Sequence, residues 1–408
     1  MKIPELSGSG KASAAQKEAL MMETFLEENY RFRRNALNGK PEFVDLSKNK
    51  DDDAEISKDS IYRTLDNVAM NTIVRRCRLE GIAKKPKTLL EEYVFSDAVK
   101  SYNPIQEYLH GLPAWNGNDE VGKMLNRLPG LTGEQNYFMR IWFRSAVAHW
   151  LQIDTLHGNE CVPTLIGAQG CGKSTFVQRI LPKELRCYYL DHFNLSNKFD
   201  KEMALANNLL VNLDELEAIR PSQQASLKQA LSKTKVNGRI IHTNVQQDRP
   251  RFASFVATTN NPHPLSDVTG SRRYLCLVIP DGSFINNEDT IDYEQLFAQI
   301  VNEVSEQKMR YWFSNEEVKR IQEMNLQFMS MTDIPDMVKC CFRKPMDKET
   351  VLPLSSDKII AVIAKEFPHM KVNHGTKVLV GRALKELGFE RKEMHNGMLY
   401  YAVPNSAA

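Results

Sequence analysis

The most constraining feature of the sequence is a glycine-rich segment set between a short apolar run and a stretch with helical character. Residues 167–174 read Gly-Ala-Gln-Gly-Cys-Gly-Lys-Ser, after the apolar run 162–166 and before the run 175–181. The spacing matches the G-x-x-x-x-G-K-[ST] phosphate loop, whose backbone N–H groups turn inward around a phosphate at the start of a helix. A chance glycine turn is the alternative. The flanking runs favour a strand, a phosphate-binding loop and a helix.

Each position of this loop has an expected part in holding a nucleotide. Lys173, expected as an exposed loop side chain, would reach the β- and γ-phosphates, and the Ser174 hydroxyl would bind Mg²⁺. ATP and Mg²⁺ are therefore the expected ligands. The expected nucleotide-binding residues are Gly167, Gln169, Gly170, Cys171, Gly172, Lys173, Ser174 and Thr175.

A second apolar run ends in two carboxylates. Residues 208–213 are followed directly by Asp214 and Glu215. Such a run predicts a parallel strand buried on both faces, and ligands of doubly wound sheets bind beyond the carboxyl ends of strands. Asp214 is therefore the expected Mg²⁺-associated carboxylate, and Glu215 the expected general base that orients the attacking water. The alternative is a solvated acidic pair at a helix start.

A third, β-rich run ends in a polar tip. Residues 252–259 stop at Asn260-Asn261-Pro262. We expect Asn260 to sense the γ-phosphate, with Asn261 as the second choice. A plain turn is the alternative, since these residues favour turns, and both interpretations can hold together.

Two arginines precede a fourth apolar run. Arg272 and Arg273 lie between Gly270 and residues 275–279. Guanidinium groups stabilise charge on a transferring phosphoryl group and are often supplied by a neighbouring subunit. One of the two is therefore a candidate arginine finger, and ordinary surface arginines are the alternative.

Taken in order, these motifs resemble the virulence-associated protein E family. The resemblance rests on the phosphate loop, then Leu-Asp-Glu-Leu, Ala-Thr-Thr-Asn-Asn-Pro and Thr-Gly-Ser-Arg-Arg-Tyr, with support from residues 35–43, 103–109 and 115–117. It covers roughly residues 28–282. It implies an AAA+-type ATPase related to superfamily 3 helicases, carried by phages and mobile elements. Many relatives are fused to a primase; the first 150 residues show no comparable module, so priming by this chain is not expected.

Composition favours an intracellular enzyme. The 408 residues are 42% hydrophobic and 25% charged, which is enough for two or three globular domains. The seven cysteines form no C-x-x-C pair, so neither a disulfide framework nor a zinc site is expected. No apolar stretch approaches the roughly 18 residues needed to span a bilayer, and no signal peptide is recognisable. We therefore expect a cytoplasmic protein without a membrane partner.

Nucleic acid is the expected macromolecular partner, and local basic clusters matter more here than the net charge of +2. Arg31, Arg33 and Arg34 form one cluster, interpreted as a solvated helix face. Residues 233–242 contain Asn237-Gly238, a strong hairpin signal, with Lys235 and Arg239 beside the expected tip. Such a hairpin could grip a single DNA strand in a central channel, mainly through its phosphates. A structural hairpin is the alternative.

The C-terminal part is predicted to be a winged helix. Residues 358–366 and 376–387 have helical apolar periodicity, and residues 389–395 and 398–403 flank a second Asn-Gly turn. The basic residues Lys377, Arg382 and Lys385 lie on the second helix, which could enter the major groove of duplex DNA. Protein docking is the alternative, because fold alone does not decide function.

The predicted fold is therefore an α/β P-loop NTPase core with a parallel sheet. The expected divisions are a flexible tail (1–14), a mainly helical N-terminal region (15–150), the ATPase core (151–328), a connector (329–355) and the winged-helix-like domain (356–408). Two functions follow: an ATP-driven oligomeric DNA motor, expected as a hexameric replicative helicase with a primase or replication partner, or a nucleotide-dependent switch that does not move along DNA.

Overall fold

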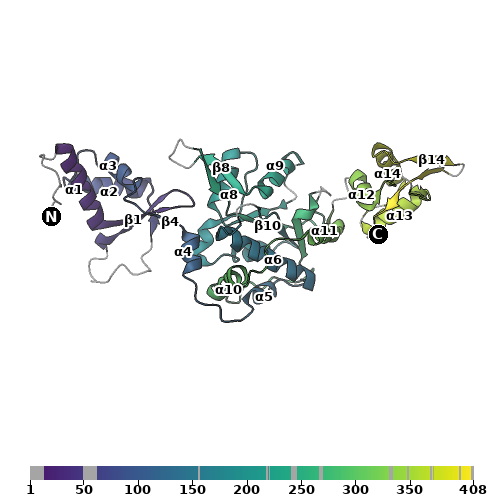
Figure 1. The fold of residues 1–408 in the computed structure, drawn as a ribbon, viewed down its shortest axis with the longest axis horizontal. Helices are drawn as coiled ribbons and strands as arrows, with labels where there is room; N and C mark the ends of the chain where they lie inside the picture. Colours follow the sequence, from purple (N-terminus) through teal and green to yellow (C-terminus); the bar gives the residue numbers. More distant parts are fainter. Residues whose placement is uncertain are drawn as a thin grey trace. The chain divides into compact units, whose positions relative to one another are not determined.

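The chain forms two units, each combining helices with β-strands (Figure 1). One unit consists of residues 1–111 with 237–247, and the other of residues 112–236 with 248–408. The computed structural model describes residues 13–48, 62–154, 157–216, 219, 221–239, 246–265, 270–329, 334–346, 349–367, 370, 372–394 and 397–405. No helix in these ranges is long and apolar enough to cross a membrane.

The N-terminal unit contains a four-stranded sheet, in the order β3-β2-β1-β4, that the sequence analysis did not predict. Phe25, Tyr30 and Phe43 belong to its core with residues of the helices. Its elements are α1 (Ala14–Asn29), β1 (Tyr30–Asn35), β2 (Pro41–Asp45), a 3₁₀ turn (Leu46–Lys48), β3 (Arg63–Thr64), α2 (Asn67–Leu79), α3 (Pro86–Val94), β4 (Ser101–Tyr102) and α4 (Pro104–His110).

The first basic cluster therefore lies on a strand and not on a helix face. The Arg33 guanidinium lies 3.9 Å from the ring centroid of Tyr62 and 3.7 Å from that of Tyr102. Its Nε also pairs with Glu42 at 2.9 Å. Two aromatic faces and a carboxylate already occupy this guanidinium, so Arg33 serves the packing of the sheet.

The second unit is built on a five-stranded sheet in the order β11-β5-β10-β7-β6, and every adjacent pair is parallel. A strand buried on both faces needs a continuous apolar run, and β5 and β10 are buried throughout. The mixed α/β class and the parallel sheet are thus as predicted. The strands are β5 (Val162–Ile166), β6 (Tyr189–Leu190), β7 (Leu210–Asp214), β10 (Ser254–Thr259) and β11 (Tyr274–Val278).

Helix α6 (Gly133–Trp150) belongs to this second unit, although the sequence analysis assigned it to the N-terminal region. Its side chains bond to the sheet strands and their approaches: Gln135 donates to the Cys276 carbonyl at 2.9 Å, and Trp142 donates to the Cys161 carbonyl at 3.2 Å. The unit boundary consequently lies near residue 111 and not at 150. The other helices are α5 (Glu120–Leu125), α7 (Lys173–Gln178), α8 (Lys198–Asn207), α9 (Pro221–Ser232), α10 (Tyr293–Val301) and α11 (Asn315–Met324), with 3₁₀ or π segments at Lys183–Tyr188, Ser271–Arg273, Asn302–Glu306 and Asn325–Phe328.

Two strands pair in the region of the predicted hairpin, but the turn predicted at Asn237-Gly238 is wrong. Strands β8 (Lys235–Arg239) and β9 (Gln246–Pro250) form a two-stranded sheet. Asn237 and Gly238 lie inside β8, so pairing with β9 overrides their turn preference. The connection between the strands, residues 240–245, lies outside the described residues.

The C-terminal region has two helices and two paired strands close to the predicted positions, and much of the expected connector is structured. Pro335, Pro345 and Pro353 are the basis for predicting a connector, yet Pro335 lies in the first turn of α12 (Ile334–Cys341), where its missing N–H costs nothing. Strands β13, β15 and β14 form an antiparallel sheet, and β12 pairs with β16. The elements are α12 (Ile334–Cys341), β12 (Phe342–Arg343), β13 (Leu354–Ser355), α13 (Ser356–Glu366), α14 (His374–Glu386), β14 (Arg391–Met394), β15 (Gly397–Tyr400) and β16 (Val403–Pro404).

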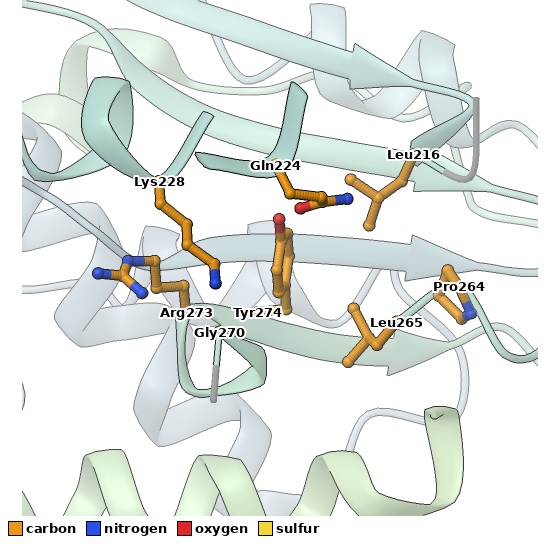
Figure 2. A pocket seen from close by; sticks show the side chains of 8 residues that line it. All are labelled: Leu216, Gln224, Lys228, Pro264, Leu265, Gly270, Arg273 and Tyr274. Carbon is orange, nitrogen blue, oxygen red and sulfur yellow. The ribbon is translucent and has the colours of Figure 1, made fainter. Parts of the chain in front are cut away.

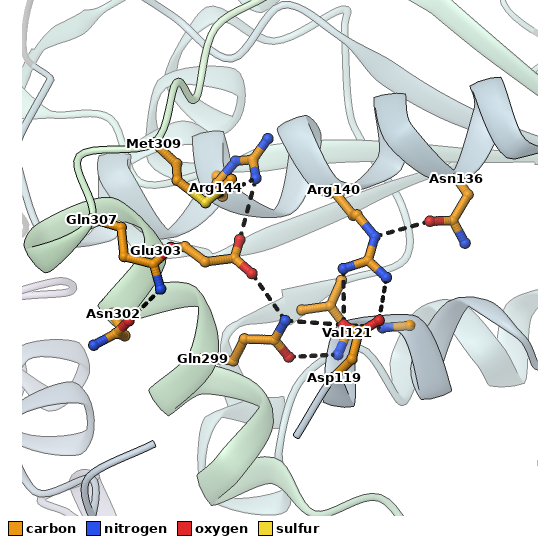
Figure 3. A network of polar contacts seen from close by, with 11 residues as sticks. Asp119, Val121, Asn136, Arg140, Arg144, Gln299, Asn302, Glu303, Gln307 and Met309 are labelled. Atoms are coloured by element: carbon orange, nitrogen blue, oxygen red, sulfur yellow. Dashed lines mark hydrogen bonds and ion pairs between the residues drawn. The ribbon is translucent and has the colours of Figure 1, made fainter. Parts of the chain in front are cut away.

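A polar network joins α5, α6 and α10 (Figure 3). Asp119 Oδ1 caps α5 by accepting the Gly122 N–H at 3.0 Å. The same carboxylate accepts two bonds from Arg140 of α6, at 2.8 and 2.5 Å. Gln299 of α10 donates to it at 3.0 Å. The Arg140 guanidinium therefore holds the pKa of Asp119 well below its usual range.

We predict that Asp119→Asn lowers the free energy of unfolding of this unit by about 1 kcal/mol at pH 7, because the amide still caps α5 but loses the charged pair with Arg140. The depressed pKa means that this stability is present above the unfolded pKa of about 3.9 and is lost as the pH falls through the folded pKa. The difference between the two proteins should therefore shrink only below about pH 4.

Urea unfolding followed by tryptophan fluorescence measures this difference, since Trp115, Trp142, Trp150 and Trp312 all lie in the second unit. Asp292→Asn is the matched control. Asp292 also caps a helix, accepting the Gln295 N–H at 3.1 Å, but has no arginine partner among the described residues. Equal effects of the two substitutions would contradict the assignment to the Arg140 pair.

Candidate functional site

The register of the parallel strands brings the predicted site residues to one edge of the sheet. Ile166 of β5 is aligned with Thr259 of β10, and Thr258 with Asp214 of β7. Gly167, Asn260 and Glu215 each follow these strand ends directly. The strands that carry the phosphate-loop, carboxylate and sensor motifs therefore end at nearly the same level, and the three motifs, far apart in sequence, lie next to one another.

The loop between β5 and α7 is shaped by its glycines. Gly170 and Gly172 have φ of 82° and 94°, in the left-handed region that glycine enters without steric cost. A methyl group at Gly172 would also lie 2.6 Å from Nδ2 of Asn287. The start of the loop is fixed by the Gly167 N–H, which donates to the Thr259 carbonyl at 3.3 Å. The chain is thus held in one curved path before α7 begins.

Lys173 is buried, contrary to the expectation of an exposed loop lysine; only 8% of its surface is accessible. Its ammonium donates to the carbonyls of Gly167 at 2.7 Å and Ala168 at 2.8 Å, and to Oδ1 of Asn260 at 2.8 Å. An ammonium has three donors and needs acceptors when it leaves water; the curved loop supplies two of them and Asn260 the third. Lys173 and Asn260 are therefore in direct contact.

The acidic pair is held by the end of β7 and its neighbour. The Thr258 hydroxyl of β10 donates to Oδ1 of Asp214. Glu215 has φ of 50°, an unusual conformation for a residue with a side chain, and it turns the chain out of the strand. Both carboxylates are exposed. Backbone strain of this kind clusters at functional sites.

These groups line one pocket of about 330 Å³, within the usual range for small-molecule sites. Thr258 and Thr259 were not selected by the sequence analysis, although their position in the Ala-Thr-Thr-Asn-Asn segment marked them. Gly167 and Cys171 contribute to the loop without lining the pocket. The lining residues are Gln169, Gly170, Gly172, Lys173, Ser174, Thr175, Asp214, Glu215, Thr258, Thr259 and Asn260.

The pocket residues fit a bound Mg²⁺ ion. Ser174 and Asp214 both offer oxygen ligands to the same pocket, and Mg²⁺ is usually held by one or two protein oxygens together with substrate phosphates and water. Within the described ranges, no group of three or more His, Cys, Asp or Glu side chains could hold a metal by itself. The pocket therefore suits a magnesium ion that arrives with a phosphate ligand.

Arg272 and Arg273 lie at the N-terminal end of a sheet strand, whereas the pocket lies beyond the C-terminal ends of the strands. They precede the first residue of β11, which runs parallel to β5. Arg273 is half-buried: its Nε lies 3.3 Å from Glu160, and its Nη2 donates to Ser232 at 3.3 Å. Figure 2 shows Arg273 beside Tyr274, facing Lys228 of α9. Arg272 is exposed and makes no hydrogen bond or ion pair within the described part of the chain.

A larger cavity, of about 830 Å³, opens at this second edge beside both arginines. Burial, with nearby Arg251 acting in the same direction, lowers the pKa of His149 in its wall to about 4, so the imidazole is neutral at pH 7. Arg251 itself is buried and binds the carbonyls of Asn159, Lys233 and Ala253 at 3.1, 2.8 and 2.9 Å. These hydrogen bonds hold in place the end of the sheet where Arg272 lies.

The expected DNA-binding residues are not gathered in one place. Lys235 is exposed on β8, and the side chain of Arg239 lies outside the described residues. Arg382 and Lys385 are exposed on α14, whereas Lys377 on the same helix pairs with Asp357. The structure thus leaves Lys235, Arg382 and Lys385 accessible.

Comparison with known proteins identifies the family. Residues 109–330, more than half of the chain, match the virulence-associated protein E-like domain. The chain therefore belongs to the virulence-associated protein E family, and the matched segment contains every residue of the pocket.

Solved structures and curated proteins add less. An A-form apo structure of the NrS-1 C-terminal region is 13% identical over 95% of this chain and 100% of that chain, with a TM-score of 0.45. A second apo structure of that region is 13% identical over 96% and 100%, with a TM-score of 0.43. Scores below 0.5 do not establish a shared fold. No curated protein matches the sequence.

Proposed function

We propose that the chain is an AAA+-type P-loop ATPase that binds ATP with Mg²⁺ and hydrolyses it at the pocket between β5, β7 and β10. The supporting observation is the convergence of Lys173, Ser174, Asp214, Glu215 and Asn260 on one pocket from separate segments of the chain. If the loop were only a glycine turn, there would be no physical reason for two carboxylates and an amide from other segments to line the same pocket.

The chemistry assigns a separate task to each side chain. The ammonium of Lys173 neutralises charge on the terminal phosphate, and the Nδ2 donor of Asn260 orients it, because the Asn260 Oδ1 already accepts from Lys173 at 2.8 Å. Glu215 accepts a hydrogen bond from water and takes its proton as oxygen attacks the γ-phosphorus, and ADP leaves. Thr258 positions Asp214. Mg²⁺, when bound, neutralises the phosphate charge.

We predict that Glu215→Gln binds Mg²⁺-ATP like the wild type but turns over at least about 10²-fold more slowly, the usual effect of losing a general base. Lys173→Ala should instead lose ATP binding. ATP titration and phosphate release measure the two properties separately. Glu184→Gln, an exposed glutamate away from the pocket, is the control and should hydrolyse normally. Wild-type turnover by Glu215→Gln would reassign the base.

The site requires a guanidinium from a second copy of the chain if it uses an arginine finger. Arg272 and Arg273 precede β11, whereas the phosphate loop follows the parallel strand β5, so the arginines and the loop lie at opposite ends of the strands. Neither arginine can therefore reach the pocket of the same subunit. Arg272 is the better candidate, because Glu160 and Ser232 already engage Arg273. A ring of subunits, each giving Arg272 to its neighbour, satisfies both conditions.

We predict that Arg272→Ala lowers the rate constant of hydrolysis by about 10³-fold with little change in ATP affinity. Arg273→Ala is the matched control. It should lower the free energy of unfolding, because Arg273 contacts Glu160 and Ser232, and change the rate constant of hydrolysis much less than Arg272→Ala does. Mixing Lys173→Ala with Arg272→Ala subunits should restore partial hydrolysis, because some mixed interfaces pair an intact loop with an intact finger. Hydrolysis by a strictly monomeric protein, with no recovery on mixing, would refute the shared site.

We further propose that hydrolysis drives movement on DNA, as in a replicative helicase of a phage or mobile element. Support comes from the exposed Lys235 on the β8–β9 sheet and from Arg382 and Lys385 on α14. A replication partner such as a primase would act with the ring. The second candidate is a nucleotide-dependent switch, which shares the pocket but not the movement.

Strand displacement separates the two candidates. With ATP, the wild type should unwind a forked duplex, and Lys235→Ala should lose DNA-stimulated hydrolysis while keeping its basal rate. The difference between the wild type and Lys235→Ala should shrink at higher salt, since the phosphate contact that Lys235 supplies weakens with ionic strength. Lys339→Ala, which removes an exposed lysine paired with Asp336, is the control. ATP hydrolysis without any strand displacement or DNA stimulation would favour the switch.

A further inference from the structure

The sheet order fixes the direction in which a bound nucleotide must extend. Strand β5, which leads into the phosphate loop, has β10 on one side and β11 on the other. Of the groups proposed to act on the terminal phosphate, Asp214 is the last residue of β7, and Glu215 and Asn260 directly follow β7 and β10. The nucleoside lies at the other end of the triphosphate, so it extends away from these groups, toward the side of β11.

The segment that follows β11 is attached to the phosphate loop at just this side. The Ile279 N–H donates to the Ile166 carbonyl at 2.8 Å, and the Ile285 N–H donates to the Cys171 carbonyl at 3.0 Å. The side chain of Asn287 donates to the Gly172 carbonyl at 2.9 Å. Residues 279–287 therefore form a wall beside the loop.

Two arginines fix the C-terminal end of this wall and the residues that follow it. Arg127, which is 9% exposed, donates to the carbonyl of Asn286 in the wall at 3.2 Å and to those of Asp289 and Thr290 just after it at 3.1 and 2.7 Å. Arg179 donates to the Asp289 carbonyl at 2.6 Å. These bonds hold the chain in place where it leaves the wall, and binding sites need such a fixed shape.

Phe284 is the exposed hydrophobic side chain on this wall. It is 74% exposed, whereas its neighbour Ile285 is 5% exposed and anchors the backbone to the phosphate loop. The amides nearby are already used: Asn286 donates to Asp289 at 2.7 Å, and Asn287 binds Gly172. The wall thus presents an aromatic face, and the side-chain N–H donors of its two asparagines already have partners.

We propose that Phe284 stacks on the nucleobase of the bound nucleotide, and that this wall recognises the face of the base and not its edge. The inference rests on the proposed function, because it requires a triphosphate in the loop. Aromatic stacking is strong but tolerant of base identity, since every base has a π-face. ATP and GTP should therefore bind with similar affinity.

Calorimetric titration with Mg²⁺-ATP, Mg²⁺-GTP and inorganic tripolyphosphate tests the proposal. Phe284→Ala should weaken ATP binding about tenfold and leave tripolyphosphate binding unchanged. Phe284→Tyr, which keeps the ring, should bind ATP like the wild type. Phe199→Ala is the matched control, because Phe199 is 47% exposed on α8, away from the wall.

Each result decides for or against the stacking. Unchanged ATP affinity in Phe284→Ala overturns it, and equal loss of ATP and tripolyphosphate reduces Phe284 to a structural role. A strong preference for ATP over GTP overturns recognition by the ring face. If these results accompany normal loss of ATP binding by Lys173→Ala, the proposed function stands without the inference. A wild type that binds neither ATP nor tripolyphosphate would remove both.

Discussion

The parallel register of β5, β7 and β10 is the constraint on which the rest of the structure depends. Because the three strands run in one direction and end level with one another, the loop after each strand opens at the same edge. A shift of one residue would turn the side chains of a strand to the other face of the sheet, and the Thr258–Asp214 contact would be lost. The pocket is thus a consequence of strand pairing, which the apolar runs stabilise by burial.

The same sheet places the charged groups of the pocket and the candidate finger arginine at opposite ends of its strands. The carboxylates and Lys173 lie beyond the strand ends, whereas Arg272 precedes the start of β11. Arg251, buried among the carbonyls of Asn159, Lys233 and Ala253, makes that second edge rigid. A side chain held on such an edge cannot fold back to its own loop. This opposition is the physical basis for proposing a site shared between subunits.

The sequence was most informative where a local rule and the tertiary structure agree. The runs before Gly167, Asp214 and Asn260 became strands, because uninterrupted apolar runs bounded by polar tips have few other solutions. The sequence was misleading where strand pairing or position in a helix outweighed a residue's turn or helix-breaking preference. Asn237-Gly238 lies inside β8, and Pro335 lies in the first turn of α12. The burial of Lys173 and the wall at Phe284 depend on contacts across more than 80 residues, which no local pattern records.

We propose that two copies of the chain build one site for Mg²⁺-ATP. The decisive measurement is a structure of the protein with Mg²⁺ and a non-hydrolysable ATP analogue. We expect the γ-phosphate to lie between Lys173 and Asn260 of one subunit, with Arg272 of the partner subunit beside it. A monomer that holds the analogue in this pocket without any guanidinium from a second copy would rule out the shared site. An analogue bound elsewhere would rule out both the shared site and the pocket.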